Sequence, residues 1–174
     1  NLGANVNTRH WETCPSLSPT GDELYFASTR PGGLGKSDIW KCKVEIQSNG
    51  HLKFSEAVNL GPTINTPDDE YSPFIHADNQ TLYYSSKGMK GLGGYDVYVS
   101  YKDGNGGWTA PKNMGYPINT CKDEVGFIVN AHGDKAYFSS NGQEKNGMGR
   151  EIYELILKEG NYKPNKSMKY ATGK

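Results

Sequence analysis

The sequence lacks several features that define large classes of proteins. Among its 174 residues, lysine and arginine number 19 and aspartate and glutamate also number 19, so the formal net charge is zero. A binder of nucleic acid or anionic membrane needs a basic excess, so we expect neither nucleic acid nor a membrane as partner. No apolar run is long enough for a transmembrane helix, and we expect no signal peptide because no basic-then-apolar segment is present.

Signatures of metal binding and catalysis are also scarce. The only cysteines are Cys14, Cys42 and Cys121, without a C-x-x-C pair, and the four histidines lack metal-ligand spacing. We expect free thiols, with one disulfide as the alternative in an oxidising compartment. No Gly-x-Ser-x-Gly nucleophile elbow occurs, and the glycine loop that ends at Ser37 has Arg30 where a phosphate-binding loop needs glycine. The sequence therefore predicts no cofactor and no metal.

Glycine and aromatic residues are abundant instead. The chain has 22 glycines, 12 tyrosines, 5 phenylalanines and 3 tryptophans, while hydrophobic residues make up only 34%. This composition favours short strands joined by many turns, since aromatic residues are enriched in strands. No segment has sustained helical periodicity, so we expect an all-β fold.

An internal repeat organises the chain. The pattern Asn-[Leu/Met]-Gly-x-x-[Val/Ile]-Asn-Thr occurs at residues 1–8, 59–66 and 113–120. An aromatic segment follows each copy, at residues 24–28, 82–86 and 136–140, and then an acidic residue starts the segments 38–40, 96–98 and 151–153. Because independent blocks keep the same order and nearly the same spacing, we interpret them as three repeats.

Each repeat is interpreted as four short strands. The expected strands are 16–18, 74–76 and 128–130 for the first, 24–28, 82–86 and 136–140 for the second, 39–44, 97–101 and 152–157 for the third, and Phe54, Trp108 and Tyr162 for the fourth. Four antiparallel strands at this period are typical of a β-propeller blade. We therefore expect three four-stranded antiparallel blades over residues 1–58, 59–112 and 113–166, with 167–174 starting a further copy.

Three blades are fewer than the roughly 4–8 of closed propellers. We therefore interpret the chain as part of a propeller. As an alternative, two chains pair head to tail through their open blade edges, since such interfaces form rings when the rotation closes.

Three motifs resemble those of a known family. Residues 18–28 are similar to the WD40-like propeller repeat of TolB-type proteins, and residues 69–73 and 91–98 are similar to its variant in OmpA-linked envelope proteins, including the type IX secretion component PorE. The resemblance implies a periplasmic or outer-membrane-associated location, protein partners in the cell envelope, and peptidoglycan contact only through a separate domain. The third repeat departs from the pattern, with Gly126-Phe127 in place of Ser-Pro and Glu151 in place of Asp.

Acidic residues recur at two positions of every repeat. They are Glu12, Glu70 and Glu124 before the first strand, and Asp38, Asp96 and Glu151 before the third. Catalytic acid and base have distinct roles and should break the repeat symmetry, so we expect structural hydrogen bonds to loop amides here. The alternatives are a glycosidase carboxylate pair for the first set and calcium ligands for the second.

The long loops of a propeller emerge on one face, where binding residues are usually placed. The candidate binding residues on this face are Arg9, Trp11, Arg30, Lys36, Lys87, Met89, Lys90, Lys145 and Arg150. Exposed Trp, Met and Arg among polar residues are typical of protein interfaces. The sequence therefore predicts a non-catalytic interaction scaffold, and the resemblance implies that it belongs to a Gram-negative cell envelope, in a peptidoglycan-linked, type IX-like secretion assembly. The alternatives are a carbohydrate-active or peptidase-associated propeller, and a glycan-binding module.

Overall fold

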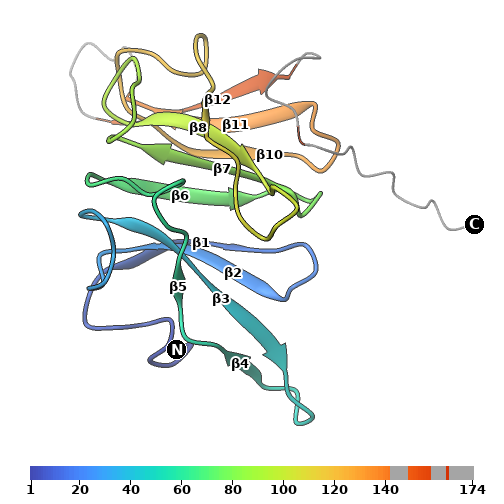
Figure 1. Ribbon diagram of the computed structural model, residues 1–174. Helices are drawn as coiled ribbons and strands as arrows, with labels where there is room; N and C mark the ends of the chain where they lie inside the picture. The colour runs from blue at the N-terminus through green and yellow to red at the C-terminus, as the bar shows by residue number, and fades with distance from the viewer. Residues whose placement is uncertain (142–148, 158–163, 165–174) are drawn as a thin grey trace, which may run out of the picture.

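Three antiparallel sheets are stacked one above another in the computed structural model (Figure 1). The structure describes residues 1–141, 149–157 and 164, and the secondary structure in this part of the chain is entirely strand. No helix among these residues is long and apolar enough to span a membrane. The predicted all-β fold with antiparallel blades is confirmed.

Each sheet is one blade. Blade 1 contains β1 (Glu12–Leu17), β2 (Glu23–Ser28), β3 (Asp38–Ile46), β4 (Leu52–Phe54) and β5 (Val58–Asn59). Blade 2 contains β6 (Glu70–Ile75), β7 (Thr81–Ser86), β8 (Asp96–Tyr101) and β9 (Lys112–Asn113). Blade 3 contains β10 (Glu124–Val129), β11 (Lys135–Ser140) and β12 (Glu151–Ile156).

The outer edge of the blades differs from the expectation. In blade 1, both β4 and β5 pair with β3, so the expected border between residues 58 and 59 runs through a strand. In blade 2, Trp108 forms only an isolated bridge to Lys102, and β9 pairs with β8 instead. The fourth strand expected at Tyr162 lies outside the described residues.

The innermost strands start earlier than expected, at the repeated glutamates rather than at residues 16, 74 and 128. A β-bulge interrupts each strand, and its residues Cys14, Ser72 and Gly126 have positive φ angles of 51°, 50° and 67°. An extra residue at a bulge breaks the period-two pattern, which hides the beginning of the strand in the sequence. The three bulges line a common cavity of about 190 Å³ between β1, β6 and β10.

The hydrophobic core lies between the blades. Tyr25 of β2 faces blade 2, where it joins a cluster with Leu82 and Tyr84 of β7. The intervening Tyr83 faces the other way and packs with Phe127 and other residues of blade 3. Because successive side chains of a strand point to opposite faces, each middle strand serves two interfaces, which explains the aromatic content.

Candidate interaction face

The long loops lie at one end of the three sheets, on the left in Figure 1. These loops include residues 29–37 and 87–95 after the second strands, and 60–69 and 114–123 before the first strands. Hydrogen bonds join loops of neighbouring blades, as between Lys36 N and the Asp68 carbonyl at 3.0 Å. The face is therefore built from several blades and held as one surface.

A carboxylate secures the loop before each first strand. Glu70 accepts hydrogen bonds from Thr66 N and Thr66 Oγ1, both at 2.7 Å, and from Ser86 Oγ at 2.7 Å. The same three bonds recur about Glu12 and Glu124. These carboxylates bind their own loop and the second strand, so their hydrogen-bonding capacity is used within the fold.

The charge environments of the first two glutamates differ. Burial raises the pKa of Glu70 above its ordinary value, and the negative charge of Asp38 acts in the same direction. Burial also acts on Glu12, but hydrogen bonds from Thr8 and Ser28 and the charge of Arg30 outweigh it and hold its pKa below the ordinary value. Among the described residues, an arginine therefore pairs with this carboxylate in blade 1 alone.

The second set of acidic residues ties down the glycine loops. Asp38 accepts Leu34 N at 2.6 Å and Asn59 Nδ2 at 3.2 Å, and Asp96 accepts the amide of Leu92 at 2.9 Å. Burial raises the pKa of Asp96 despite these bonds. No group of His, Cys, Asp or Glu that could hold a metal ion occurs among the described residues.

Glu151 does not share this arrangement. Its side chain is exposed and accepts a hydrogen bond of 2.5 Å from the Tyr153 hydroxyl. The preceding loop, residues 142–148, lies outside the described residues.

Most of the predicted face residues are exposed. Exposed side chains are those of Arg9, Trp11, Lys36, Lys87, Lys90 and Arg150, with Trp11 at 80%. Lys36 pairs with Asp68 at 2.8 Å, Lys87 lies 4.3 Å from the Tyr95 ring centroid, and Arg150 lies 3.9 Å from Asp123. Lys145 lies outside the described residues.

Arg30 is not part of the exposed face, because its guanidinium packs beneath that face. The guanidinium donates to the Val6 carbonyl at 2.5 Å and to Glu12 at 3.3 Å, and it lies over the rings of Phe26 and Trp40. Cation–π contact and hydrogen bonds together hold this side chain inward. Its role is to fasten the N-terminal loop onto blade 1.

Met89 is likewise half-buried and packs against the core between blades 1 and 2. Its sulfur accepts a hydrogen bond of 3.7 Å from the hydroxyl of Tyr84, the counterpart of Phe26 in the repeat. Arg30 and Met89 thus do not occupy equivalent positions of the repeat. They nevertheless pack against equivalent aromatic residues, Phe26 in blade 1 and Tyr84 in blade 2.

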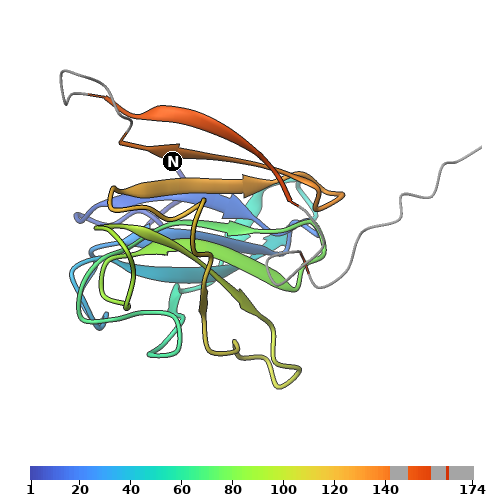
Figure 2. The same ribbon diagram turned by 90° about the horizontal axis from the view of Figure 1, so that it is seen from above.

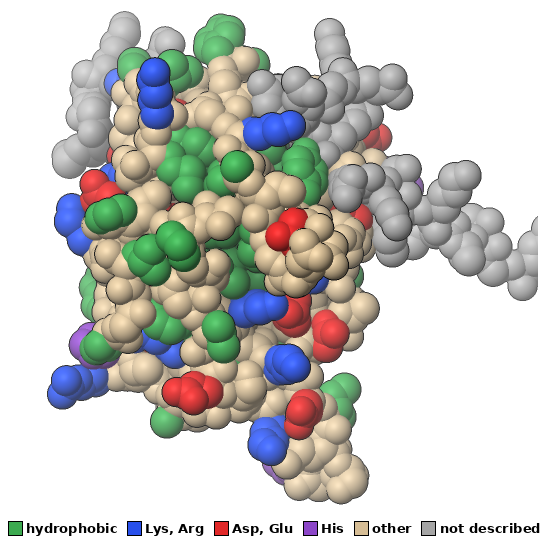
Figure 3. All heavy atoms as spheres, viewed as in Figure 1, with side chains coloured by type: hydrophobic (Ala, Val, Ile, Leu, Met, Phe, Trp, Pro, Cys, Tyr) green, Lys and Arg blue, Asp and Glu red, His purple; other side chains and the backbone are tan. Residues whose placement is uncertain are grey.

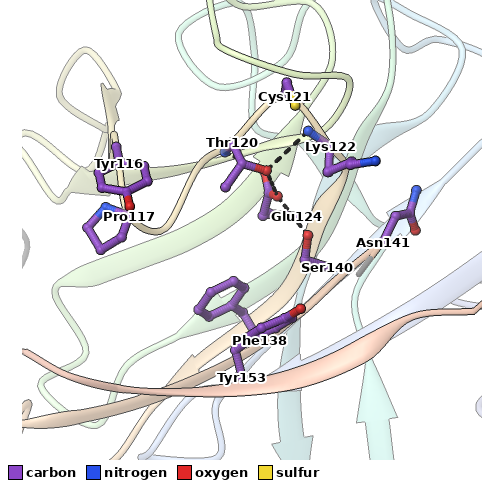
Figure 4. Close-up of a pocket in the computed structure, with 10 residues that line it drawn as sticks. All are labelled: Tyr116, Pro117, Thr120, Cys121, Lys122, Glu124, Phe138, Ser140, Asn141 and Tyr153. Atoms are coloured by element: carbon purple, nitrogen blue, oxygen red, sulfur yellow. Dashed lines mark hydrogen bonds between the residues drawn. The ribbon is translucent and has the colours of Figure 1, made fainter. Parts of the chain in front are cut away.

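In blade 3 the corresponding place is a cavity of about 300 Å³ (Figure 4). Its walls include Phe138, Ser140, Tyr153 and Glu124, which are the counterparts of the residues that contact Arg30 in blade 1. Figure 4 shows Glu124 bonded to Thr120 and Ser140, so this carboxylate also serves the fold. This cavity could not be predicted from the sequence, because its existence depends on which side chain packs in the space.

Charges of both signs are mixed over the molecule. In the view of Figure 3, Lys and Arg side chains alternate with Asp and Glu, and hydrophobic side chains lie between them. No extended area of one sign is visible on this side of the described residues, in keeping with the zero net charge.

Comparisons with known proteins agree on the fold. No family model matches the sequence, and no curated protein is significantly similar to it. Among solved structures, TolB from Acinetobacter baumannii has 16% identity and a TM-score of 0.52, with 86% of this chain and 31% of that chain covered. An alpha-L-arabinofuranosidase from Lactobacillus brevis has 15% identity and a TM-score of 0.52, with 88% and 51% covered.

The chain spans 31% and 51% of the lengths of these two structures. At such low identity the likeness shows the fold and leaves activity open, since one fold hosts many functions. The repeated sheets and the structural likeness together show that the chain has a β-propeller fold, as TolB does.

Proposed function

We propose that the chain is a non-catalytic protein-interaction module of a Gram-negative cell envelope, which presents its long loops to a protein partner in the periplasm. The observation that carries this proposal is that two groups of side chains on the loop face have different roles. The repeated glutamates form the internal bonds of the loops, whereas Trp11, Lys87, Lys90 and Arg150 are exposed on the same face.

This arrangement suits recognition of a protein. Tryptophan and arginine are enriched among the residues that dominate interface energies, and a rigid scaffold limits the ordering cost of binding. The resemblance to TolB-type repeats supports an envelope location, at the periplasmic side or associated with the outer membrane. A secretion assembly, with peptidoglycan contacted through a separate domain, is the more specific form of this proposal.

The test is comparative affinity capture from envelope extracts of the source organism, with quantitative mass spectrometry. The wild type is compared with Lys87→Glu/Lys90→Glu on the loop face. The matched control is Lys53→Glu/Lys135→Glu, at exposed lysines of β4 and β11 outside the long loops. We expect one envelope protein to be retained by the wild type and the control and reduced at least about tenfold by the loop-face variant.

Equal recovery with all three chains would contradict the proposal. Binding to a glycan array that is lost in Trp11→Ala would instead favour the glycan-binding alternative, because an exposed indole is a stacking platform for sugars.

A further inference from the structure

The same junction joins blade 1 to blade 2 and blade 2 to blade 3. The side chain of Asn65, in the loop before β6, accepts Ile39 N at 2.8 Å and donates to the Ile39 carbonyl at 3.0 Å. Asn119 does the same to Val97, at 2.7 and 2.9 Å. Both asparagines are buried, so each Asn-Thr loop secures the third strand of the preceding blade.

Backbone hydrogen bonds run alongside each asparagine. Glu70 N donates to the Ser37 carbonyl at 2.7 Å, and in the next junction Glu124 N donates to the Tyr95 carbonyl at 2.7 Å. Each blade is thus recognised by the next blade through two features. One is the side-chain amide of an asparagine, and the other is a backbone hydrogen bond from the glutamate that starts the next first strand.

Blade 3 presents an open copy of the recognised surface. Ile152 is the counterpart of Ile39 and Val97, which are 0% exposed, but it is 78% exposed itself. Tyr137, the counterpart of the fully buried Tyr25 and Tyr83, is 38% exposed. Figure 2 looks down onto blade 3, and no described segment crosses over β12.

Blade 1 presents an open copy of the recognising loop. Asn7 is the counterpart of Asn65 and Asn119, and its amide nitrogen donates to Asn1 Oδ1 at 2.9 Å, as theirs donate to Asn59 and Asn113. Within the described residues, no third strand of a preceding blade lies against Asn7. A cavity of about 110 Å³ opens beside it, with walls that include Leu2, Val6, Leu24 and Phe26.

We propose that these two surfaces bind each other in a second copy of this chain, blade 3 of one copy against blade 1 of the other. In this head-to-tail junction, Asn7 bonds the backbone N–H and C=O of Ile152, and Glu12 N donates to the Arg150 carbonyl. The side chains of Ile152 and Tyr137 enter the cavity beside Val6. A second copy is the occupant because this chain carries both halves of a junction that it already forms twice.

Two copies supply six blades, within the range of roughly 4–8 for closed propellers, so two such junctions close a ring. The inference concerns the ends of the stack of blades. It shares Arg150 with the loop face, but the junction uses the backbone carbonyl of this residue, whereas the loop-face proposal uses its side chain.

The first experiment measures molar mass by size-exclusion chromatography with light scattering. We expect the wild type to have the mass of two chains and Ile152→Arg the mass of one, because arginine cannot be buried at the junction. Ile46→Arg is the matched control, since Ile46 is also 78% exposed but lies away from both surfaces, and it should keep the mass of two chains. A wild type that has the mass of one chain at all concentrations overturns the proposal, and so does an unchanged mass for Ile152→Arg.

A mixing experiment tests the head-to-tail arrangement. Asn7→Asp removes the amide donor to the Ile152 carbonyl, so this variant alone should have the mass of one chain, with unchanged circular dichroism. Mixed with Ile152→Arg, it restores one intact junction, and the mass of two chains should return. If Asn7→Asp alone keeps the mass of two chains, or if the mixture keeps the mass of one, the proposal is contradicted.

Discussion

Buried acidic side chains show how much the local donors matter for a single residue. Glu70 and Asp78 are both buried, and burial raises the pKa of each. Asp78 nevertheless has a pKa far below its ordinary value, because Thr81 Oγ1, Thr81 N and Gln80 N all donate hydrogen bonds to its carboxylate. The number and charge of the donors therefore decide the sign of the shift.

Asp78→Asn tests this balance through the pH dependence of stability. Because the pKa of Asp78 is lower in the folded than in the unfolded chain, its ionised form stabilises the fold at neutral pH, and this contribution is lost as the pH falls below about 4. We expect the substitution to reduce the free energy of unfolding by about 1–3 kcal/mol at neutral pH. The loss should be clearly smaller near pH 3, as measured by urea denaturation.

The control is Asp134→Asn, at an exposed position of the matching turn in blade 3, which should have a smaller effect at neutral pH. An equal loss for Asp78→Asn at both pH values would show that shape rather than charge explains its role.

At the scale of strands, the regular parts of the blades were predictable from the sequence. The aromatic segments at residues 24–28, 82–86 and 136–140 coincide with β2, β7 and β11, because apolar side chains on both faces leave a clear signal. The first strands were placed too late, because the bulges at Cys14, Ser72 and Gly126 interrupt the alternation. The outer strand was harder still, since pairs as short as β5 and β9 leave almost no pattern.

Substitutions at two glycines distinguish the cost of a strained backbone from the cost of a clash between blades. Gly126 has a positive φ with free space around its α-carbon, so Gly126→Ala should cost only the left-handed conformation, about 1–2 kcal/mol. A Cβ at Gly93 would lie 2.0 Å from the Lys122 carbonyl of the next blade, so Gly93→Ala must push two backbones apart. We expect it to cost about 3 kcal/mol, near the upper end for overpacking, as measured by urea denaturation. Equal losses for the two variants would contradict this account of the junction.

For the whole molecule, the exposure of side chains on the loop face was easier to predict from the sequence than the packing beneath that face. Arg9, Trp11, Lys87, Lys90 and Arg150 are exposed there because loop position alone is enough to place them. Arg30 and Met89 pack inward instead, and the composition of a loop does not reveal which side chain fills the space beneath it. The open cavity of blade 3 was missed for the same reason.

Each Asn-Thr loop secures the third strand of the blade before it, and blade 3 offers the same strand unsecured. Amide hydrogen exchange at Ile39, Val97 and Ile152 measures this difference, since these are equivalent positions in the three blades. We expect strong protection of the Ile39 and Val97 amides at every concentration. The Ile152 amide should exchange fast in dilute solution, more slowly as the protein associates, and fast at every concentration in Asn7→Asp. Protection of Ile152 that equals that of Val97 in the Asn7→Asp variant would contradict this expectation.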